Sequence, residues 1–185
     1  MENLKLENFS TGYTNDFIIK SIDLSVKSGE WLGVIGPNGA GKSTLIKGIC
    51  RIIKPFQGSL YLKGKDINRF TNKIISQTIS FLPQQFNSNM QVTVKELVAL
   101  GRSPYKNFWE FDLNKTDNKK INEALNLVDM YDFKDTLITQ ISGGQRQRAY
   151  LALALAQDPE ILILDEPTNA LSLIHISEPT RQRVI

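Results

Sequence analysis

The sequence predicts an α/β fold with a mainly parallel sheet, an antiparallel β region before it and a helical subdomain inserted within it. Three observations predict this class. A glycine-rich stretch, Gly36 to Thr44, stands between the apolar run 31–35 and a segment with helical spacing of apolar residues. Ile161 to Leu164 form a second unbroken apolar run, which is typical of a parallel strand buried on both faces. Between about Asn87 and Gln140 helical patterns replace strand patterns, so the insertion is expected there.

The N-terminal region is expected to form an antiparallel pair of strands. Apolar residues recur with strand spacing in two segments, which the turn-forming residues 11–16 separate. Residues 28–30 then turn into a predicted buried strand, Trp31 to Ile35. The apolar residues of the antiparallel pair are Leu4, Leu6 and Phe9 in the first strand, and Ile22, Leu24 and Val26 in the second.

A helix is expected to begin at Ser43, directly after the glycine-rich stretch. Gly58 to Leu62 then resemble a short strand followed by a turn at 63–66, and Ile79 to Leu82 a further strand that Pro83 ends. The expected apolar face of the helix consists of Leu45, Ile46, Ile49, Ile52 and Ile53.

Two helices are expected in the inserted region. Thr93 to Glu96 has the form of a capping box before the first, and apolar residues repeat at helical intervals from Ile121 to Val128 in the second. The segment between them, Gly101 to Lys115, is unusually aromatic for a loop. It is either an ordered core contact or an exposed contact for a partner. After Ile141 a further helix is expected, from Gln145 to Gln157.

The glycine-rich stretch fits a phosphate-binding pattern of two glycines with four residues between them, followed by Lys and a hydroxyl residue. Glycines here let the backbone turn tightly and aim its N–H groups at a β-phosphate. Lys42 would add a positive charge between the β- and γ-phosphates, and Ser43 would offer its hydroxyl to Mg²⁺ at the positive end of a helix. We therefore predict a nucleotide site made of Gly36, Pro37, Asn38, Gly39, Ala40, Gly41, Lys42, Ser43 and Thr44.

Two carboxylates follow the second apolar run directly. Asp165 and Glu166 would lie at the carboxyl edge of the sheet, where the glycine-rich loop also opens. Asp165 is predicted to hold Mg²⁺, directly or through water, and Glu166 to polarise an attacking water as the catalytic base.

The stretch Ser142-Gly143-Gly144-Gln145 precedes the last predicted helix. It has the form of a capping box with loop glycines, and it equally fits a second anion site made by the N–H groups of a helix N-terminus. Because the chain has one phosphate loop, a second anion site suggests a nucleotide held by another copy. The spacing alone leaves both interpretations open.

Composition excludes several classes of protein. The net charge is +3 and basic residues form no concentrated stripe, so no nucleic-acid partner is predicted. Cys50 is the only cysteine, which rules out a disulfide framework within the chain, and its apolar neighbours favour a buried structural role. The N-terminus lacks a signal-peptide pattern and no run approaches 18 apolar residues, so a cytoplasmic location is expected.

Three motifs together resemble those of ABC-type ATPases. Gly36 to Thr44 is similar to the Walker A motif, Ile141 to Ala149 to the signature, and Ile161 to Thr168 to Walker B. The similarity extends from about residue 2 to Leu171. It implies a P-loop NTPase core of the RecA type, which binds ATP and Mg²⁺ and hydrolyses ATP, with Lys42 and Glu166 among the catalytic residues.

The resemblance also implies roles for further residues. Tyr13 is similar to the aromatic residue that stacks on adenine. Gln84 is similar to the Q-loop glutamine, which contacts the metal and the attacking water and communicates with the membrane partner. In this family Ser142 and Gly144, with Gly143 and Gln145 beside them, would contact the γ-phosphate bound by the opposite subunit of a head-to-tail dimer.

Residues 94–105, with 142–157, look most like the ATPases of importers for ferric siderophores, haem and cobalamin. The implied partners are a second ABC subunit, in a homodimer or another ABC-type dimer, integral membrane permease subunits and, indirectly, a substrate-binding protein. The implied location is peripheral, on the cytoplasmic face of the cell membrane. Two alternatives stay open: a non-catalytic ATP-binding fragment, and a soluble ABC-type factor acting on ribosomes or DNA.

The resemblance ends after Leu171. Ser172 stands where the family pattern has Asp, and His175 lies too soon after Glu166 to be the family's switch histidine. Residues 172–185 resemble translated sequencing-adapter sequence, and we hypothesise that they are an artefact joined to a genuine cassette. We therefore expect a fold that is incomplete at its C-terminus, poor solubility and severely reduced ATP hydrolysis. The expected parts are residues 1–86 (antiparallel region and phosphate loop), 87–140 (helical subdomain), 141–171 (signature helix and Walker B strand) and 172–185 (tail).

Overall fold

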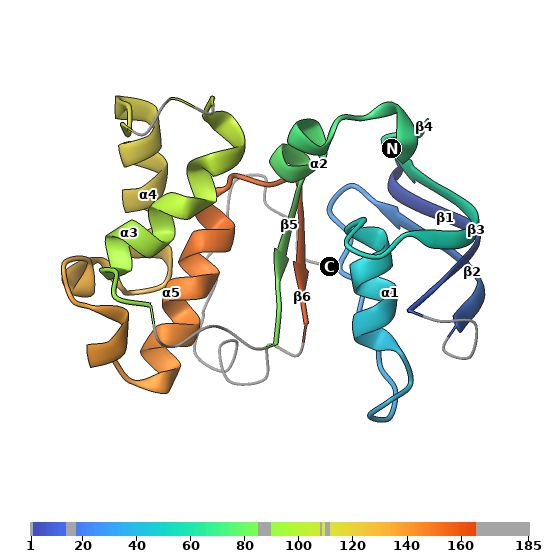
Figure 1. Cartoon of the computed structure of the whole chain (residues 1–185), viewed down its shortest axis with the longest axis horizontal. Coiled ribbons are helices and arrows are strands. Elements are labelled where there is room, and N and C mark those ends of the chain that lie inside the picture. Colours follow the sequence, from blue (N-terminus) through green and yellow to red (C-terminus); the bar gives the residue numbers. More distant parts are fainter. Residues whose placement is uncertain (1, 14–17, 85–89, 108, 110–111, 166–185) are drawn as a thin grey trace. The chain divides into compact units, whose positions relative to one another are not determined.

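The computed structural model describes residues 2–13, 18–84, 90–107, 109 and 112–165. They fall into two compact units, one ending at Ile75 and the other beginning at Ser76. Figure 1 shows the elements of both units, each of which is described below by itself. The mixed architecture, with an antiparallel sheet first and a parallel pair later, agrees with the predicted α/β class. The four-part division expected from the sequence stays a prediction.

The first unit is built on a four-stranded antiparallel sheet in the order β2-β1-β3-β4. Its strands are β1 (Glu2–Gly12), β2 (Ile18–Lys27), β3 (Pro55–Leu62) and β4 (Lys65–Asp66), and the 3₁₀ helix η1 (Ile67–Arg69) follows. The predicted antiparallel pair is confirmed residue for residue, because its apolar positions face one another across β1 and β2. The pairs are Leu4 with Val26, Leu6 with Leu24, and Phe9 with Ile22.

A β-bulge in β1 explains why its apolar spacing changes from two residues to three. From Leu6 to Phe9 the strand advances three residues while β2 advances two, and Asn8 takes a left-handed conformation with φ of 46°. On the other side of β1, Gly58 accommodates the bulge. A Cβ on Gly58 would lie 2.2 Å from the backbone oxygen of Asn8, so only glycine fits there.

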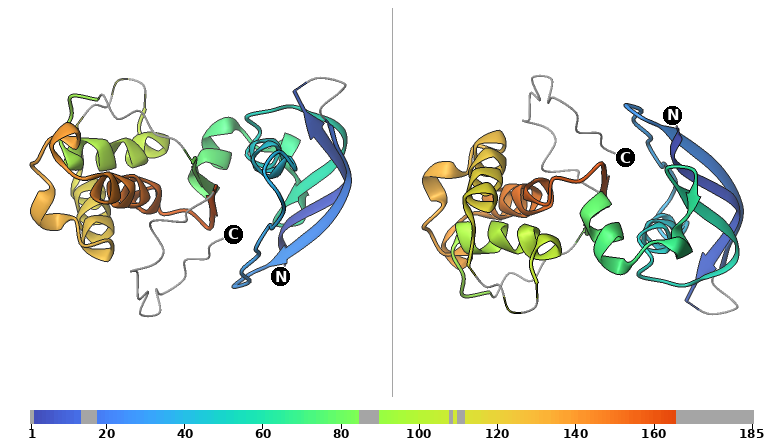
Figure 2. Two further views of the ribbon diagram at one scale, coloured as in Figure 1. Left: turned by 90° about the horizontal axis from the view of Figure 1, so that it is seen from below. Right: turned by 90° about the horizontal axis from the view of Figure 1, so that it is seen from above.

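Helix α1 (Lys42–Ile49) covers one face of this sheet, as Figure 2 shows. Its approach depends on Gly48, where a Cβ would lie 2.7 Å from the side chain of Thr11 in β1. The predicted apolar face is correct for the three residues inside the helix and wrong for Ile52, which lies beyond the helix and is exposed. The helix ends at Ile49, so Ile52 and Ile53 no longer follow its periodicity. The core joins helix and sheet through Leu4, Leu6, Phe9, Val26, Leu45, Ile46, Ile49, Leu60 and Leu62.

The prediction of a buried strand at Trp31 to Ile35 is wrong in this structure. These residues form neither strand nor helix, and Ile35 is 97% exposed. An apolar run becomes a parallel strand only when neighbouring strands pair with it and other elements cover both faces. In the part of the chain that the structure describes, no strand pairs with 31–35.

The second unit combines a parallel pair of strands with a cluster of helices. The pair is β5 (Ile79–Leu82) and β6 (Ile161–Leu164), and both strands are in their predicted places. Helices α3 (Val94–Ala99) and α4 (Lys115–Leu127) and the 3₁₀ helix η2 (Leu100–Tyr105) pack on α5 (Gly143–Ala156). The remaining elements are α2 (Asn72–Thr78), which runs across the boundary between the units, η3 (Tyr131–Phe133) and η4 (Ile138–Gln140).

The predicted helix signals of this unit are confirmed. Thr93 and Glu96 form a reciprocal capping box at the start of α3. In the second helical segment Ile121, Ala124, Leu125 and Val128 are all buried. The two ends of the helical segment also meet: the N–H groups of Val94 and Ile138 donate to Thr136 and Val92 respectively, both at 2.9 Å. These bonds close the segment at its base.

The aromatic stretch after α3 is partly ordered and partly exposed. Tyr105 ends η2 and stacks on the guanidinium of Arg102, with 3.9 Å between Cζ and the ring centroid. Trp109 is 82% exposed. Phe108 and Phe111 lie outside the described residues. Tyr105 therefore makes an ordered contact but is 36% exposed, so both interpretations of the stretch stay predictions.

We expect Gly101→Ala to destabilise the second unit by about 1–3 kcal/mol. A Cβ at position 101 would lie 2.3 Å from the backbone oxygen of Leu153, so η2 would have to move away from α5. Urea unfolding of the variant and the wild type measures the loss. Gly33→Ala is the matched control, because no atom lies within 4 Å of its added Cβ. Equal stability of the Gly101 variant and the wild type would contradict the close packing.

Candidate nucleotide-binding site

The glycine-rich loop leads into α1 without a side-chain cap. Gly39 and Gly41 have φ of 81° and 90°, which favours glycine at both positions. Gly41 is the N-cap of α1 and offers no side chain to accept from the first turn. The first N–H groups of a helix have no partner within the helix, so those of α1 are directed out of its N-terminus as donors. This donor set and the positive end of the helix dipole fit a phosphate group.

Lys42 lies across the same loop. Its Nζ donates to the backbone oxygens of Gly36 at 2.8 Å and Pro37 at 3.1 Å. The ammonium group is therefore held beside the loop by its own carbonyls, where a phosphate oxygen could take their place as acceptor. Pro37, Asn38, Gly39 and Ala40 are exposed along the loop, and Ser43 and Thr44 are half-buried at the start of the helix.

Tyr13 belongs to the same unit as the loop and lies against α1. It is 59% exposed, and Lys47 donates from Nζ to its hydroxyl at 3.0 Å and lies 5.7 Å from its ring centroid. The structure therefore brings Tyr13 to the helix that follows the loop. No pattern in the sequence indicates Lys47, because its contact joins residues 34 positions apart.

Gln84 and Asp165 follow the two parallel strands at the same end. Leu82 and Leu164 are opposite one another in the register, and the N–H of Asp165 donates to the oxygen of Leu82 at 2.9 Å. Gln84 is exposed, while Asp165 is 7% exposed. Glu166 lies outside the described residues. Ser43 belongs to the other unit, so a shared magnesium site of Ser43, Gln84 and Asp165 stays a prediction.

The turn before α5 has the predicted capping box. Ser142 Oγ accepts from the N–H of Gln145 at 3.2 Å, and Gln145 Oε1 accepts from the N–H of Ser142 at 2.8 Å. Gly143 and Gly144 are exposed, and no atom lies within 4 Å of a Cβ on either one. The capping box uses the third N–H of the helix, so the N–H groups of both glycines are left without an intrahelical partner. The local geometry accommodates both interpretations, and the anion-binding role stays a prediction.

The second unit contains a buried charge cluster that the sequence patterns did not predict. Asp117, 1% exposed, accepts from Arg102 Nε at 3.0 Å and from Lys106 Nζ at 2.5 Å. Burial works to raise the pKa of Asp117, but hydrogen bonds from Lys106, Arg102 and the Asn114 N–H hold that pKa below its ordinary value. The available signal was the pattern Asn114-x-x-Asp117, which forms the capping box of α4.

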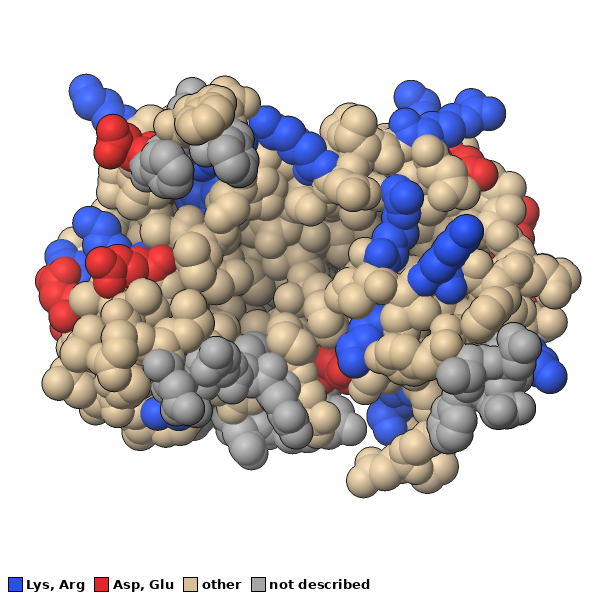
Figure 3. All heavy atoms as spheres, in the orientation of Figure 1, with Lys and Arg blue, Asp and Glu red and all other residues tan. Residues whose placement is uncertain are grey.

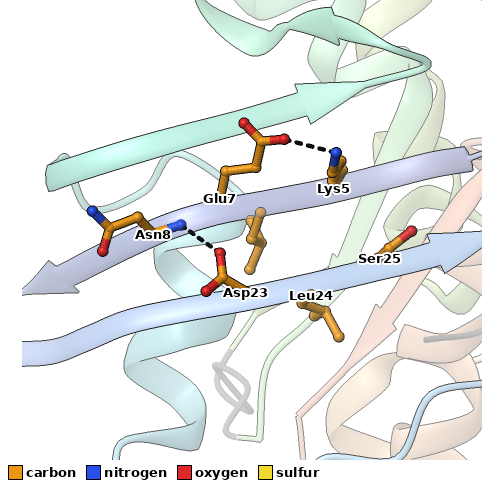
Figure 4. Close-up of a pocket in the computed structure, with 7 residues that line it drawn as sticks. Lys5, Glu7, Asn8, Asp23, Leu24 and Ser25 are labelled. Atoms are coloured by element: carbon orange, nitrogen blue, oxygen red, sulfur yellow. Dashed lines mark hydrogen bonds and ion pairs between the residues drawn. The ribbon is translucent and has the colours of Figure 1, made fainter.

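The outer face of β1 and β2 carries a shallow depression, which Figure 4 shows. Its charged groups already have partners: Lys5 with Glu7 at 2.7 Å, and Asp23 with the N–H of Asn8 at 2.8 Å. The depression therefore offers a ligand little that is unpaired. Figure 3 shows Lys and Arg side chains at several places on one face, with some Asp and Glu side chains among them. The residues that line the depression are Lys5, Leu6, Glu7, Asn8, Asp23, Leu24 and Ser25.

Two other kinds of feature are absent from the described residues. They contain no helix that is both long enough and apolar enough to cross a membrane. Among the same residues, no three His, Cys, Asp or Glu side chains gather as metal ligands.

We expect Cys50 to react with iodoacetamide at pH 8 more than about a hundredfold more slowly than an exposed cysteine, whose pKa is about 8.5. Burial raises the pKa of the Cys50 thiol to about 12, so the thiol stays protonated at this pH. Mass spectrometry of the alkylated chain measures the rate. The same reaction in urea is the control and should be fast; rapid alkylation of the folded chain would refute the assignment of a buried, inert thiol.

Solved structures of ATP-binding cassettes share this fold. The ADP conformation of MJ1267, an ATP-binding cassette of an ABC transporter, matches with a TM-score of 0.77 and 27% identity over 91% of this chain and 70% of that one. The similarity confirms the predicted P-loop NTPase fold. The fold and the glycine-rich loop together place this chain in the class of nucleotide-binding cassettes.

The chain belongs to the ABC transporter family, whose profile matches residues 19–169. It is 40% identical to the achromobactin transport ATP-binding protein CbrD of Dickeya dadantii, over 89% of this chain and 61% of the relative. It is 39% identical to the iron(3+)-hydroxamate import ATP-binding protein FhuC of Bacillus subtilis, over 95% and 65% respectively. The predicted resemblance is confirmed, and the chain spans less than two thirds of the length of these relatives.

Proposed function

We propose that this chain is the nucleotide-binding part of the ATP-hydrolysing subunit of an ABC importer. The observation that supports this most directly is the first turn of α1, which has no side-chain cap and follows two left-handed glycines. Lys42 lies beside the same turn. This is a donor set for a nucleotide phosphate, and Tyr13, held against α1, provides an aromatic ring for the base.

Hydrolysis transfers the γ-phosphoryl group of ATP to water. Lys42 and the loop N–H groups stabilise the negative charge that develops on the phosphate oxygens. Ser43, Gln84 and Asp165 are the residues that would hold Mg²⁺, which neutralises phosphate charge when bound. Glu166 accepts the proton of the attacking water as general base, and Gln84 orients that water.

A second ABC subunit completes each site. Ser142, Gly143, Gly144 and Gln145 would contact the γ-phosphate of the ATP bound by the opposite subunit. ATP binding then closes a head-to-tail dimer and hydrolysis reopens it, because ATP has the higher affinity for the closed state. Exposure of Ser142, Gly143 and Gly144 supports this role, since a partner's nucleotide has to reach them.

The transported substrate is proposed to be an iron–siderophore complex, haem or cobalamin. Support comes from the similarity to the achromobactin transport and iron(3+)-hydroxamate import proteins. Membrane permease subunits and, indirectly, a substrate-binding protein would select that substrate. The location that follows is peripheral, on the cytoplasmic face of the membrane.

We expect Lys42→Met to weaken MgATP binding about 10- to 100-fold, which corresponds to the loss of about 1.5–3 kcal/mol for a hydrogen bond to a charged group. Isothermal titration with ATP measures the Kd. Lys54→Met is the matched control, because Lys54 is an exposed residue of the same unit beyond α1 and should leave the Kd unchanged. Equal affinity of the Lys42 variant and the wild type would remove the proposed phosphate site.

We expect Glu166→Gln to lower the kcat of ATP hydrolysis about 10²- to 10⁴-fold, since it removes the general base. The Kd for MgATP should stay within about threefold. Phosphate release measures kcat, both in this chain and in one extended to the length of its relatives. Glu160→Gln, an exposed carboxylate shortly before β6, is the control. Binding without hydrolysis in both wild-type chains would favour the non-catalytic alternative.

A further inference from the structure

The last turn of α5 accepts a hydrogen bond from a buried charged side chain, the guanidinium of Arg102 in η2. Arg102, 5% exposed, donates from Nη1 to the backbone oxygen of Ala156 at 2.9 Å. The same guanidinium donates from Nε to Asp117 at 3.0 Å. One side chain thus ties η2, the first turn of α4 and the last turn of α5 together.

Each charge of this pair lies at the helix end that favours it. Asp117 is in the first turn of α4, where the dipole is positive, and Arg102 contacts the end of α5, where the dipole is negative. A second ion pair joins the same two helices: Lys120 of α4 lies 3.0 Å from Asp158, just after α5. This second pair is partly exposed and therefore weaker.

The same turn of α5 is fixed to the strands. Gln157 donates from Nε2 to the backbone oxygens of Ser76 and, at 2.8 Å, Ile79, and its Oε1 accepts from Ser80 Oγ at 3.1 Å. All of these partners belong to the second unit. The end of α5 is therefore the point where the helices and the β5–β6 pair are joined by directional hydrogen bonds.

We propose that Arg102 is a positioning residue, which fixes the last turn of α5 and thereby sets where its first turn, Ser142 to Gly144, lies. This inference rests on the proposed function, because it gives that turn the role of contacting a phosphate. Arg102 touches no predicted nucleotide contact and acts only through α5.

The length of α5 makes its far end sensitive to the direction of the helix. A helix of 14 residues is about 21 Å long at about 1.5 Å per residue. A tilt of about 5° at the last turn then moves the first turn by about 2 Å, and a misplacement of about 1 Å can reduce a rate about a hundredfold. The buried pair is well suited to fixing that direction. Its attraction offsets its desolvation, so its net contribution to stability is small, whereas its hydrogen bonds fix geometry.

The test combines a distance and a rate. Spin labels at Gln140, just before α5, and at Gln84, just after β5, both exposed, are introduced in a Cys50→Ala background, and their separation is measured by double electron–electron resonance. The kcat is measured on the unlabelled variants. The variants are Arg102→Met and the double variant Arg102→Met/Asp117→Asn, which removes both charges of the Arg102–Asp117 pair where the single variant folds poorly. Leu125→Ala, a fully buried change in α4 without polar contacts to α5, is the control for lost stability.

We expect the label distance to shift or broaden by about 2 Å in the Arg102 variants and to stay unchanged in Leu125→Ala. The kcat for ATP should fall at least about tenfold, with the Kd for MgATP within about twofold, because the phosphate loop belongs to the other unit. Arg102→Lys, which keeps the charge but forms fewer of the bonds, should recover part of the kcat.

An unchanged label distance in both Arg102 variants would overturn the inference, as would an equal shift in Leu125→Ala at an equal loss of stability. A shifted distance in a protein whose wild type neither binds nor hydrolyses MgATP would overturn the proposed function while supporting the positioning of the turn by Arg102.

Discussion

The N–H groups in the first turn of each helix need hydrogen-bond partners. This chain supplies them in one way in helices α3, α4 and α5, and in another way in α1, the helix that we propose binds a phosphate. Helices α3, α4 and α5 each begin with a reciprocal capping box. Helix α1 has Gly41 as its N-cap, which has no side chain to accept from the first turn. A helix end without a cap is stabilised by an anion that binds there. The missing cap of α1 thus follows from the function proposed for it.

Helix α5 begins with a side-chain cap and two exposed glycines. The side chain of Ser142 accepts from the third residue of the helix, Gln145, so the helix start is stable without a ligand. The capping box leaves the N–H groups of Gly143 and Gly144 without a partner within the helix. The proposed contact with a phosphate carried by another subunit is therefore compatible with a helix start that is already capped.

Short-range signals made most of the fold predictable from the sequence. The capping boxes at Thr93 and Ser142 join residues three positions apart, and the β1–β2 pairing follows from the strand spacing of apolar residues. The capping box at Asn114 and the bulge at Asn8 were not predicted. The motifs also located the loop and the Ser142 turn. By contrast, the hydrogen bond from Arg102 to Ala156 joins residues 54 positions apart, and the one from Gln157 to Ile79 joins residues 78 positions apart. No local sequence pattern predicts such contacts. The prediction of a buried strand at 31–35 was wrong for a related reason, because the burial of such a strand depends on distant elements rather than on its own sequence.

The geometry of the phosphate loop depends on the helix after it rather than on the chain before it. Burial stabilises an aliphatic or aromatic side chain by roughly 1.5–3 kcal/mol, and Trp31 and Ile35 largely forgo this because they are exposed. The loop is still fixed on its other side, where Gly48 brings α1 against Thr11 and Gly41 meets the side chain of Ile19. The donors that we propose to face a phosphate belong to this anchored half. The antiparallel sheet therefore supports the nucleotide site directly, by holding α1 in place through its packing against β1.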